Sequence, residues 1–543
     1  MRFMGQGVMF GVVLIGIGSV LTGQVVTAEH APASTPQNVL WISIDDQSPW
    51  YGTYGDNTVA TPNIDQLAAE GVVFERAYAP TPVCSPSRSA MITGSYSIRL
   101  GTHDHRSGRV PSYQIELPEW VQTLPELFRA AGFETYNSDK DDFNFSYERS
   151  DLYSLGNPNP ASVMQGKTKE AMALATKRET VAKKSVAVAV KEGIGDARAE
   201  ETTTLDSGQK GWKGVSGGGD WRDVPEGASF FGQMSIAGGK RVRDIASELE
   251  VLGLASVSPK AVRVPAQYPD IPQVRQHVAN HYSSILRTDH QVGQVVARLK
   301  ADGLWHQTVI FLYSDHGSDL PRSKEFCYAE GLHVPLIVVA PGRPEVVPGT
   351  RRSDLVNLMD IAATSLALAG LDVPDTMDAR NLFAPDYARS VVFSSADRMS
   401  NVLDRVRSVM GDRYHYIRNF YTDRPLMNWG HREMIALADP EASSFLMIRR
   451  LAEAGRLTPA QAAPYGARAA EELYDLMSDP DEVVNLADDP AYRAILEEKR
   501  EQLDVWVQAT DDKGQYPRSA AALQEITGRF PKAWLRSPEF SRE

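Results

Sequence analysis

Alternating apolar runs and amphipathic segments along the chain predict an α/β domain. The segments "NVLWISI" (38–44) and "TVIFLY" (308–313) are nearly continuous apolar runs rich in β-branched residues, a pattern typical of strands buried on both faces. "VVFERAY" (72–78) predicts a further strand. The stretch 282–299 places its apolar residues on one helical stripe, and Gly303 follows as a stop signal. Strands that alternate with helices indicate a largely parallel sheet.

The pattern changes near residue 386, where short strands replace this alternation. The predicted strands are "SVVFSSAD" (390–397), the two halves of "VRSVMGDRYHYIRNFY" (406–421) and "AEELYDL" (470–476). A turn at Gly411-Asp412 and the short spacing favour an antiparallel sheet, and residues 491–510 have the pattern of a closing amphipathic helix. We therefore predict a small α+β domain over residues 386–530.

A large catalytic α/β domain is predicted over residues 36–385, with an insertion inside it at 165–218. The insertion begins with "GKTKEAMALATKRETVAKKSVAVAVKEG", which is rich in Ala, Lys and Glu and indicates surface helix. It ends near "VSGGGD", which is typical of a flexible connector. We assign no chemistry to this segment.

The N-terminus has the pattern of a secretory signal peptide over residues 1–28. Arg2 provides a positive start, residues 8–21 form a short apolar run, and Val26-Thr27-Ala28 resembles a cleavage site. The apolar run is shorter than the roughly 20 residues of a spanning helix. We expect an exported protein, periplasmic or secreted, with no integral membrane span in the mature chain; an uncleaved anchor is the alternative.

Composition excludes some partners and leaves others open. The chain has 543 residues, 42% of them hydrophobic, which suits two or three globular domains. Its formal net charge of −13 makes nonspecific binding to nucleic acid unfavourable and repels anionic membranes. We expect no nucleic-acid partner. An anionic substrate remains possible because a site needs only a few local cations.

Two strand ends bring acidic residues to loops that follow the predicted sheet. Asp45-Asp46 come directly after the strand at 38–44, and Asp315-His316 follow the strand at 308–313. Ligands of open α/β sheets bind at the carboxyl ends of the strands, and several oxygen donors gathered there suit a hard divalent cation.

Only two cysteines occur, Cys84 and Cys327, and a disulfide between them is one reading for an exported chain. The surroundings of Cys84 favour another. The segment "PVCSPSRSAMITG" (82–94) has the form Cys-x-Pro-Ser-Arg followed by Thr-Gly, which resembles the signature of the sulfatase family. This resemblance implies that a formylglycine-generating enzyme oxidises Cys84 to formylglycine, whose hydrate is the nucleophile. Pro86 suits the first turn of a helix that directs its N–H groups toward residue 84, and Arg88 can reach back to the same position.

The resemblance extends over about residues 36–512 and is closest to the sulfamidase, or heparan N-sulfatase-like, branch. The segments that carry it include "NVLWISIDDQSPWYGTYGD", "GTHDHR" (101–106), "SDHGSDLPRSKEFCYAEGLHVPLIV" and "AEELYDLMSDPDEVVNLA". The resemblance implies an alkaline-phosphatase-like fold: a large domain with a central mixed, mostly parallel sheet and a small C-terminal domain with an antiparallel sheet.

The resemblance also implies roles for individual residues. The implied ligands of one divalent cation, with Ca²⁺ the expected ion, are Asp45, Asp46, modified Cys84, Asp315 and His316. Many sulfatases have asparagine where His316 stands, and its nitrogen would also suit a transition metal. Lys140 and Lys324 match the two lysines that hold the sulfate, and Arg88 completes the nucleophile segment.

Two departures from the family pattern leave the general acid open. Where many sulfatases have a histidine two residues after the first lysine, this chain has Asp142, and no histidine follows the strand predicted at 229–236. Lys240 is expected to take over that second contact with the leaving group. The candidate acids are His103, His105 and His333.

Together, these features predict hydrolysis of a sulfate ester or sulfamate on a sulfated saccharide. Arg398 and Asn401, in "ADRMSNVLDR", are expected to line the sugar subsite from the small domain. Two alternatives stay open: a phosphomonoester or phosphonate hydrolase of the same fold, and a non-catalytic protein that binds sulfated glycans.

Overall fold

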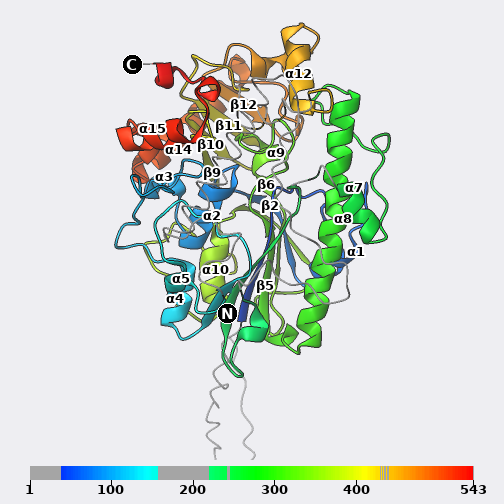
Figure 1. Ribbon diagram of the computed structural model, residues 1–543, viewed down its shortest axis with the longest axis vertical. Helices are drawn as coiled ribbons and strands as arrows, with labels where there is room; N and C mark the ends of the chain where they lie inside the picture. Colours follow the sequence, from blue (N-terminus) through cyan, green and yellow to red (C-terminus); the bar gives the residue numbers. More distant parts are fainter. Residues whose placement is uncertain are drawn as a thin grey trace, which may run out of the picture. The chain divides into compact units, whose positions relative to one another are not determined.

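Parallel pairing of two apolar strands forms the centre of the large sheet (Figure 1). The computed structural model describes residues 38–156, 219–240, 242, 245–427, 430, 432, 436 and 440–541. Every residue of β1 (Asn38–Ile44) and β5 (Thr308–Ser314) is buried. Burial on both faces explains why neither strand alternates apolar with polar residues. The predicted signal peptide and the predicted insertion at 165–218 lie outside the described residues.

Eight strands of the described chain form this mixed sheet. The other six are β2 (Val72–Tyr78), β3 (Glu134–Asn137), β4 (Phe230–Ile236), β6 (His333–Val334), β7 (Leu336–Val339) and β8 (Thr350–Asn357). Their order is β3-β4-β1-β5-β7-β2-β6, with β8 paired to β2. The β3–β4, β4–β1, β1–β5 and β2–β8 pairs are parallel, whereas β7 is antiparallel to β5 and β2, as is β6 to β2. The prediction of a mixed, mostly parallel sheet is confirmed.

Helices surround both sheets of the described chain. The α-helices are α1 (Pro62–Ala69), α2 (Cys84–Thr93), α3 (Ser97–Leu100), α4 (Leu124–Ala130), α5 (Arg149–Leu152), α7 (Ile245–Val251), α8 (Pro272–Ala301), α9 (Ala329–Leu332), α10 (Asp360–Leu368), α12 (Ser444–Glu453), α13 (Pro459–Ala462), α14 (Arg493–Ala509) and α15 (Ala520–Arg529). The short 3-10 helices are Gly52–Tyr54, Trp221–Asp223, Trp305–Gln307, Ala463–Tyr465, Pro490–Tyr492, Lys513–Gln515, Lys532–Trp534 and Pro538–Ser541. Among the described helices, none is both long and apolar enough to cross a bilayer.

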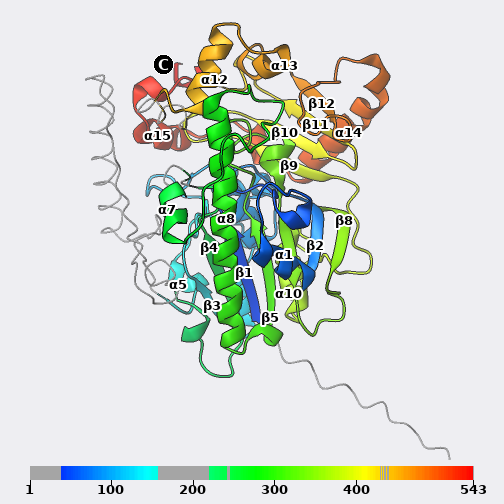
Figure 2. The ribbon, with the colours of Figure 1, turned by 90° about the vertical axis from the view of Figure 1, so that its right-hand side faces the viewer.

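The two faces of the large sheet are covered by different helices, as Figures 1 and 2 show. Successive residues of a strand point to opposite faces. Val39 and Trp41 accordingly pack into an apolar core with residues of α2, α4 and α10, whereas Leu40 and Ile42 pack into a second core with residues of α1 and α8. The helices pack on the two faces of the sheet, and polar side chains occur where β1 and β5 end.

The long helix α8 begins earlier than the sequence pattern indicates. The predicted stripe starts at Tyr282, but the helix starts at Pro272, which occupies a first-turn position where a missing N–H costs nothing. Val274 and Val278 are fully buried and continue the apolar stripe toward the N-terminus. Polar residues between these valines interrupt the helical spacing of apolar residues, so the sequence pattern does not predict the first turns of the helix.

A separate four-stranded antiparallel sheet follows, as predicted, and its strand order is β12-β11-β10-β9. Its strands are β9 (Val392–Ala396), β10 (Val406–Met410), β11 (Tyr414–Asn419) and β12 (Glu471–Asp475). Helix α14 confirms the predicted closing helix, whereas α15 is not anticipated from the pattern. The described residues from Asn38 onward belong to one compact unit, and an independent domain over 386–530 stays a prediction.

A buried arginine joins the small sheet to the C-terminal segment. Arg407, on β10, is fully buried and hydrogen-bonds Asp397 and Asp512 with both sides of its guanidinium group, over 2.7–3.0 Å. Because both carboxylates are buried as well, removal of the arginine would leave Asp397 as an unpaired negative charge in the interior, whereas Asp512 would keep its pair with Arg405 at 3.0 Å.

We predict that Arg407→Met lowers the free energy of unfolding by about 3–5 kcal/mol, because breaking a buried ion pair leaves uncompensated charge. The matched control is Arg493→Met, which removes a pair with Glu497 whose side chains are 78% and 61% exposed; exposed pairs contribute about 1 kcal/mol or less. Urea denaturation of the three proteins measures both losses. Equal losses in the two variants would contradict this account of the Arg407 network.

Candidate active site

The register between β1 and β5 brings two pairs of polar residues together at one edge of the sheet. Ile44 pairs with Ser314, so Asp45-Asp46 and Asp315-His316 leave the sheet at the same level. The backbone N–H of Asp46 donates to Asp315 Oδ1 at 3.2 Å. Asp46 adopts a positive φ of 55°, a conformation that few non-glycine residues occupy without a local partner. The predicted meeting of these strand ends is therefore present in the fold.

Helix α2 places Cys84 against these residues. The helix begins at Cys84 itself, two residues before the predicted start at Pro86, and all of its residues are buried. Cys84 Sγ lies 3.2 Å from His316 Nε2, 3.6 Å from Lys324 Nζ and 3.8 Å from Asp46 Oδ1. Burial opposes ionisation of the thiol, but Lys140 and Lys324 still lower the pKa of Cys84 below its ordinary value. Both cysteines are free thiols, so the disulfide reading is wrong.

Arg88 holds the acidic residues of the two strand ends in place. Its Nε donates to Asp315 Oδ2 at 2.9 Å, and its Nη2 donates to Asp45 Oδ1 and to Ser43 Oγ. The sequence predicts instead that Arg88 reaches back to residue 84. In the structure its described hydrogen bonds go to the acids and to backbone and hydroxyl groups, so it positions the carboxylates.

Three lysines converge on the same acids from separate loops. Lys140 Nζ lies 3.2 Å and Lys240 Nζ 3.4 Å from Asp45 Oδ2, and Lys324 Nζ lies 2.6 Å from Asp46 Oδ2. Their side chains are 16%, 31% and 12% exposed, so this face of the site is reachable from solvent. The lysines hold the pKa of both carboxyls far below the usual range despite burial, which favours protonation.

Two glycines allow Lys240 to reach this position. The loop after β4 packs so tightly on the first acidic pair that a Cβ at Gly238 or Gly239 would lie 2.0 Å from a backbone oxygen of Asp45 or Asp46. The N–H of Gly239 also donates to the Asp45 carbonyl at 2.8 Å. Glycine is therefore required for the close approach that brings Lys240 to Asp45.

The donor groups fit a divalent cation. The ligand atoms of Asp46, Cys84 and His316 lie within 4.8 Å of one another, and all three residues are buried. His316 Nδ1 contacts the Gly317 carbonyl at 2.9 Å, which orients Nε2 toward Asp46 and Cys84. Burial opposes protonation of this imidazole, yet Asp315, Cys84 and Asp46 raise its pKa to about 10. A bound cation would compensate the same negative charge and compete with that proton.

The three candidate histidines lie in different surroundings. His333 Nε2 contacts the backbone oxygen of Glu75 at 2.8 Å and its ring packs on Tyr78, so it has a structural role in β6. His105 is buried, with Nδ1 3.2 Å from Ser400 Oγ and with burial lowering its pKa far below the usual range. No described hydrogen bond or ion pair joins His103 to Cys84 or to the acids. Within the described residues, none of the three therefore has a hydrogen bond or ion pair with the nucleophile position, and the identity of the general acid stays a prediction.

Arg398 and Asn401 are buried. Each is 1% exposed. Arg398 Nη1 donates to the Ser400 carbonyl, and Asn401 Nδ2 donates to the Trp534 carbonyl, both at 2.8 Å. The C-terminal segment at Trp534 thus contacts Asn401, and the expectation that Arg398 and Asn401 line the sugar subsite stays a prediction.

Asp139 and Asp142 lie beside Lys140, and the sequence pattern does not predict their interactions. Asp142 adopts a φ of 59° and binds both Lys140 Nζ, at 3.3 Å, and Arg109. These cations hold the pKa of Asp142 well below its usual range against the effect of burial, so this residue is an ionised anchor for Lys140. Burial raises the pKa of Asp139 to about 6. The role of Asp142 and the raised pKa of Asp139 follow from tertiary contacts and burial, which the sequence does not show.

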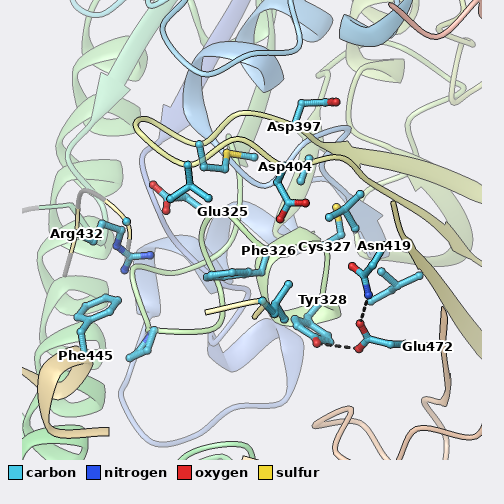
Figure 3. Close-up of a pocket in the computed structure, with 18 residues that line it drawn as sticks. Glu325, Phe326, Cys327, Tyr328, Asp397, Asp404, Asn419, Arg432, Phe445 and Glu472 are labelled. Carbon is cyan, nitrogen blue, oxygen red and sulfur yellow. Dashed lines mark hydrogen bonds between the residues drawn. The ribbon is translucent and has the colours of Figure 1, made fainter. Parts of the chain in front are cut away.

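A neighbouring cavity of about 40 Å³ is lined by Glu325, the residue that follows Lys324 in the sequence (Figure 3). It lies between the loop containing Glu325 and Phe326 and the small sheet, where Glu472 accepts hydrogen bonds from Tyr328 and Asn419. Its lining holds more carboxylates than cations and excludes Cys84. An anion would be repelled there, so this cavity is not the place for a sulfate group.

Comparisons with known proteins agree with this geometry. A family model described as Sulfatase matches residues 37–189 and 229–371. An ulvan-active sulfatase of Formosa agariphila is 30% identical over 496 residues, which cover 89% of this chain and 76% of the relative. The N-sulphoglucosamine sulphohydrolase of Homo sapiens is 24% identical over 506 residues, covering 88% of this chain and 91% of the relative.

Solved structures share the fold. A 2-O GAG sulfatase has a TM-score of 0.54 and 19% identity, with 91% of this chain and 96% of that chain covered. A phosphonate monoester hydrolase of Agrobacterium radiobacter has a TM-score of 0.55 and 18% identity, with 87% and 96% covered. At this identity the likeness concerns the fold alone. Since the family model matches more than half of the residues and the Formosa relative covers most of the chain, this protein belongs to the sulfatase family.

Proposed function

We propose that this protein hydrolyses a sulfate ester or sulfamate on a sulfated glycan, with residue 84 as the nucleophile. The observation that carries the proposal is the position of Cys84, which lies within 4 Å of a carboxylate, an imidazole and a lysine. A structural cysteine needs no such set of charged neighbours and is usually surrounded by apolar groups, as Cys327 is.

The nucleophile is proposed to be formylglycine, made from Cys84 by a formylglycine-generating enzyme. The hydrated aldehyde supplies one hydroxyl that displaces the leaving group from sulfur and a second hydroxyl whose deprotonation releases sulfate. Around it, Arg88 holds Asp45 and Asp315 in fixed positions, and His316 is oriented by the Gly317 carbonyl.

Binding of the sulfate is assigned to the cationic side chains that are partly exposed. Lys140 and Lys324 are anchored by Asp45 and Asp46, so their charges are preorganised before substrate arrives. Asp45, Asp46, Asp315, His316 and residue 84 would hold one divalent cation, which would neutralise sulfate oxygens. Oxygen donors predominate among these ligands, which favours Ca²⁺.

The leaving group is proposed to be protonated by Lys240. Its ammonium group lies 3.4 Å from Asp45 Oδ2, and it is the most exposed of the three lysines. A group that protonates the departing oxygen or nitrogen must reach the outer side of the sulfate, where the sugar is attached. His333 and His105 do not offer this contact, because His333 lies in β6 and His105 is buried. His103 is half-buried and stays the alternative candidate for the acid.

The substrate class is proposed from the relatives. The names of these relatives refer to ulvan and to N-sulphoglucosamine, so an N-sulfated glucosamine end and an O-sulfate of a sulfated polysaccharide are the substrates to test first. Export through the predicted signal peptide at 1–28 would place the enzyme in the periplasm or outside the cell, where such polymers occur. A screen of defined sulfated saccharides with free sulfate as the readout identifies the linkage.

A phosphonate or phosphomonoester hydrolase is the second candidate, since the phosphonate monoester hydrolase of Agrobacterium radiobacter shares the fold. The rates with 4-nitrophenyl sulfate, 4-nitrophenyl phosphate and a phenylphosphonate monoester separate the two. We expect sulfate hydrolysis to dominate. A larger kcat/KM with phosphate or phosphonate would replace the present proposal.

We predict that Cys84→Ala lowers kcat by at least ~10³-fold, because removal of a covalent nucleophile leaves only binding and electrostatic effects. Cys327→Ala is the matched control, since it removes the other buried cysteine without touching the acids. Hydrolysis of 4-nitrophenyl sulfate measures both variants. Full turnover by Cys84→Ala would contradict the assignment of the nucleophile.

We predict that dialysis against EGTA lowers the melting temperature and that added Ca²⁺ restores it, because a ligand that binds only the folded state at about 100 times its Kd stabilises by about 2.7 kcal/mol. Asp46→Asn should abolish this Ca²⁺-dependent shift. Asp412→Asn, at a side chain that is 79% exposed, is the control and should keep it. Differential scanning calorimetry gives the readout. A melting temperature of the unaltered protein that does not respond to any divalent ion would contradict the proposed cation site.

We predict that Lys240→Gln lowers kcat for a sugar sulfate by ~10²-fold or more, because a general acid contributes most when the leaving group is basic. The same variant should lose much less with 4-nitrophenyl sulfate, whose leaving group needs little protonation. Lys140→Gln is the comparison: it weakens sulfate binding and should slow both substrates alike. Parallel losses with both substrates in Lys240→Gln would instead assign this lysine to sulfate binding.

A further inference from the structure

Beside the sulfate-binding residues lies a group of arginines, here called the arginine cluster, that the proposed mechanism does not use. Its members come from the segment after α3, from the loop after β9 and from the C-terminal region: Arg106, Arg109, Arg398, Arg518 and Arg529. The carboxylates among them are Asp104, Asp142 and Glu525. Five guanidinium groups therefore face three carboxylates.

Each of these carboxylates is already engaged by one arginine. Arg518 binds Asp104 with two hydrogen bonds of 2.8 Å. Arg109 binds Asp142, and Arg529 Nη2 donates to Glu525 Oε1 at 3.1 Å. The positive charges of Arg398 and Arg106 remain without a carboxylate of their own in hydrogen-bonding contact.

Several buried donors of the arginine cluster lack a hydrogen-bond partner. Arg398 Nε and Nη2 are buried and unpartnered, although Nε lies 3.7 Å from an oxygen of Asp104. Arg106 Nε and Arg109 Nε are also buried without a partner among the described atoms. Because a buried donor without a partner is costly, four such donors at one place favour the binding of an acceptor there.

The electrostatics agree with an excess of positive charge. Burial, followed by repulsion from Arg398, lowers the pKa of Arg529 to about 10, and Arg109 and Arg106 add to the repulsion. Glu525 only partly offsets these effects. An anion bound among these groups would remove the repulsion.

The arginine cluster adjoins the nucleophile and is reachable from solvent. The backbone N–H of Arg106 donates to the hydroxyl of Ser85, the residue after Cys84, at 2.8 Å. Arg109 shares Asp142 with Lys140. Helix α15, red in Figure 1, contributes Arg529, whose side chain is 22% exposed and donates to the Arg106 carbonyl at 2.6 Å. A substituent of the bound sugar could enter beside Arg529 and Arg106, with the buried Arg398 supplying charge beneath it.

We propose that the arginine cluster binds a second anionic group of the substrate, a carboxylate or a sulfate other than the one cleaved, and so selects glycans that carry at least two negative charges. This inference rests on the proposed function. Planar guanidinium groups suit both anions because they can donate two parallel hydrogen bonds to paired oxygens. This local excess of arginines explains how an acidic chain, with a net charge of −13, can bind a polyanion.

The test is calorimetric titration of a heparin-derived tetrasaccharide, which carries both carboxylates and sulfates, into the mature protein. Arg529→Gln and Arg106→Gln should each weaken its Kd by ~10-fold or more, since hydrogen bonds to charged groups contribute about 1.5–3 kcal/mol. Arg529→Lys, which keeps the charge but not the paired donors, should bind with intermediate affinity. Arg493→Gln removes the same charge at a side chain that is 78% exposed and should change Kd less than twofold.

Titration of carboxyl-reduced and of desulfated tetrasaccharide tells which anion is bound. The derivative that lacks the recognised group should bind the unaltered protein and Arg529→Gln equally. The inference is overturned if the tetrasaccharide does not bind the unaltered protein, or if Arg529→Gln and Arg106→Gln bind it as well as Arg493→Gln does. Circular dichroism and melting temperatures check that the variants are folded. Hydrolysis of 4-nitrophenyl sulfate by the unaltered protein tests the proposed function separately, because this probe carries one negative charge.

Discussion

The in-register parallel pairing of β1 with β5 is the constraint on which the site depends. Because Ile44 lies opposite Ser314, Asp45-Asp46 and Asp315-His316 follow the two strands at the same level of the sheet. The strand pairing itself therefore brings these side chains together. Arg88 then bridges Asp45 and Asp315, which are far apart in sequence, and draws the N-terminal turn of α2 against them. The position of Cys84 follows from these two interactions.

The ion pairs around residue 84 position the three lysines that are proposed to bind the substrate. Each of the three lysines is paired with an acid, so none has to be ordered when an anion arrives. Asp142 adds a second anchor to Lys140 from a strained backbone position, and Arg109 connects that anchor to the arginine cluster. The site that would hold the reacting sulfate and the group that would hold a second anion therefore share one chain of ion pairs.

Much of this arrangement follows from local sequence patterns, but the pairing of long side chains does not. The apolar runs ending in Asp45 and Asp315 predict both strands and their meeting, and the strand before Ala237 predicts the loop that carries Lys240. The partners of Arg88 could not be predicted, because they depend on where two other segments lie. The burial of Arg398 and Asn401 could not be predicted for a similar reason: it depends on tertiary contacts, such as the hydrogen bond from Asn401 to the Trp534 carbonyl in the C-terminal segment.

Residue 84 itself offers the most direct test of the account. The mature protein, purified from its native host, is digested, and the peptide that contains residues 82–94 is weighed by mass spectrometry. Conversion of the thiol to an aldehyde makes this peptide about 18 Da lighter than the unmodified sequence. The account predicts the lighter mass; an unmodified cysteine in an actively hydrolysing preparation would contradict it.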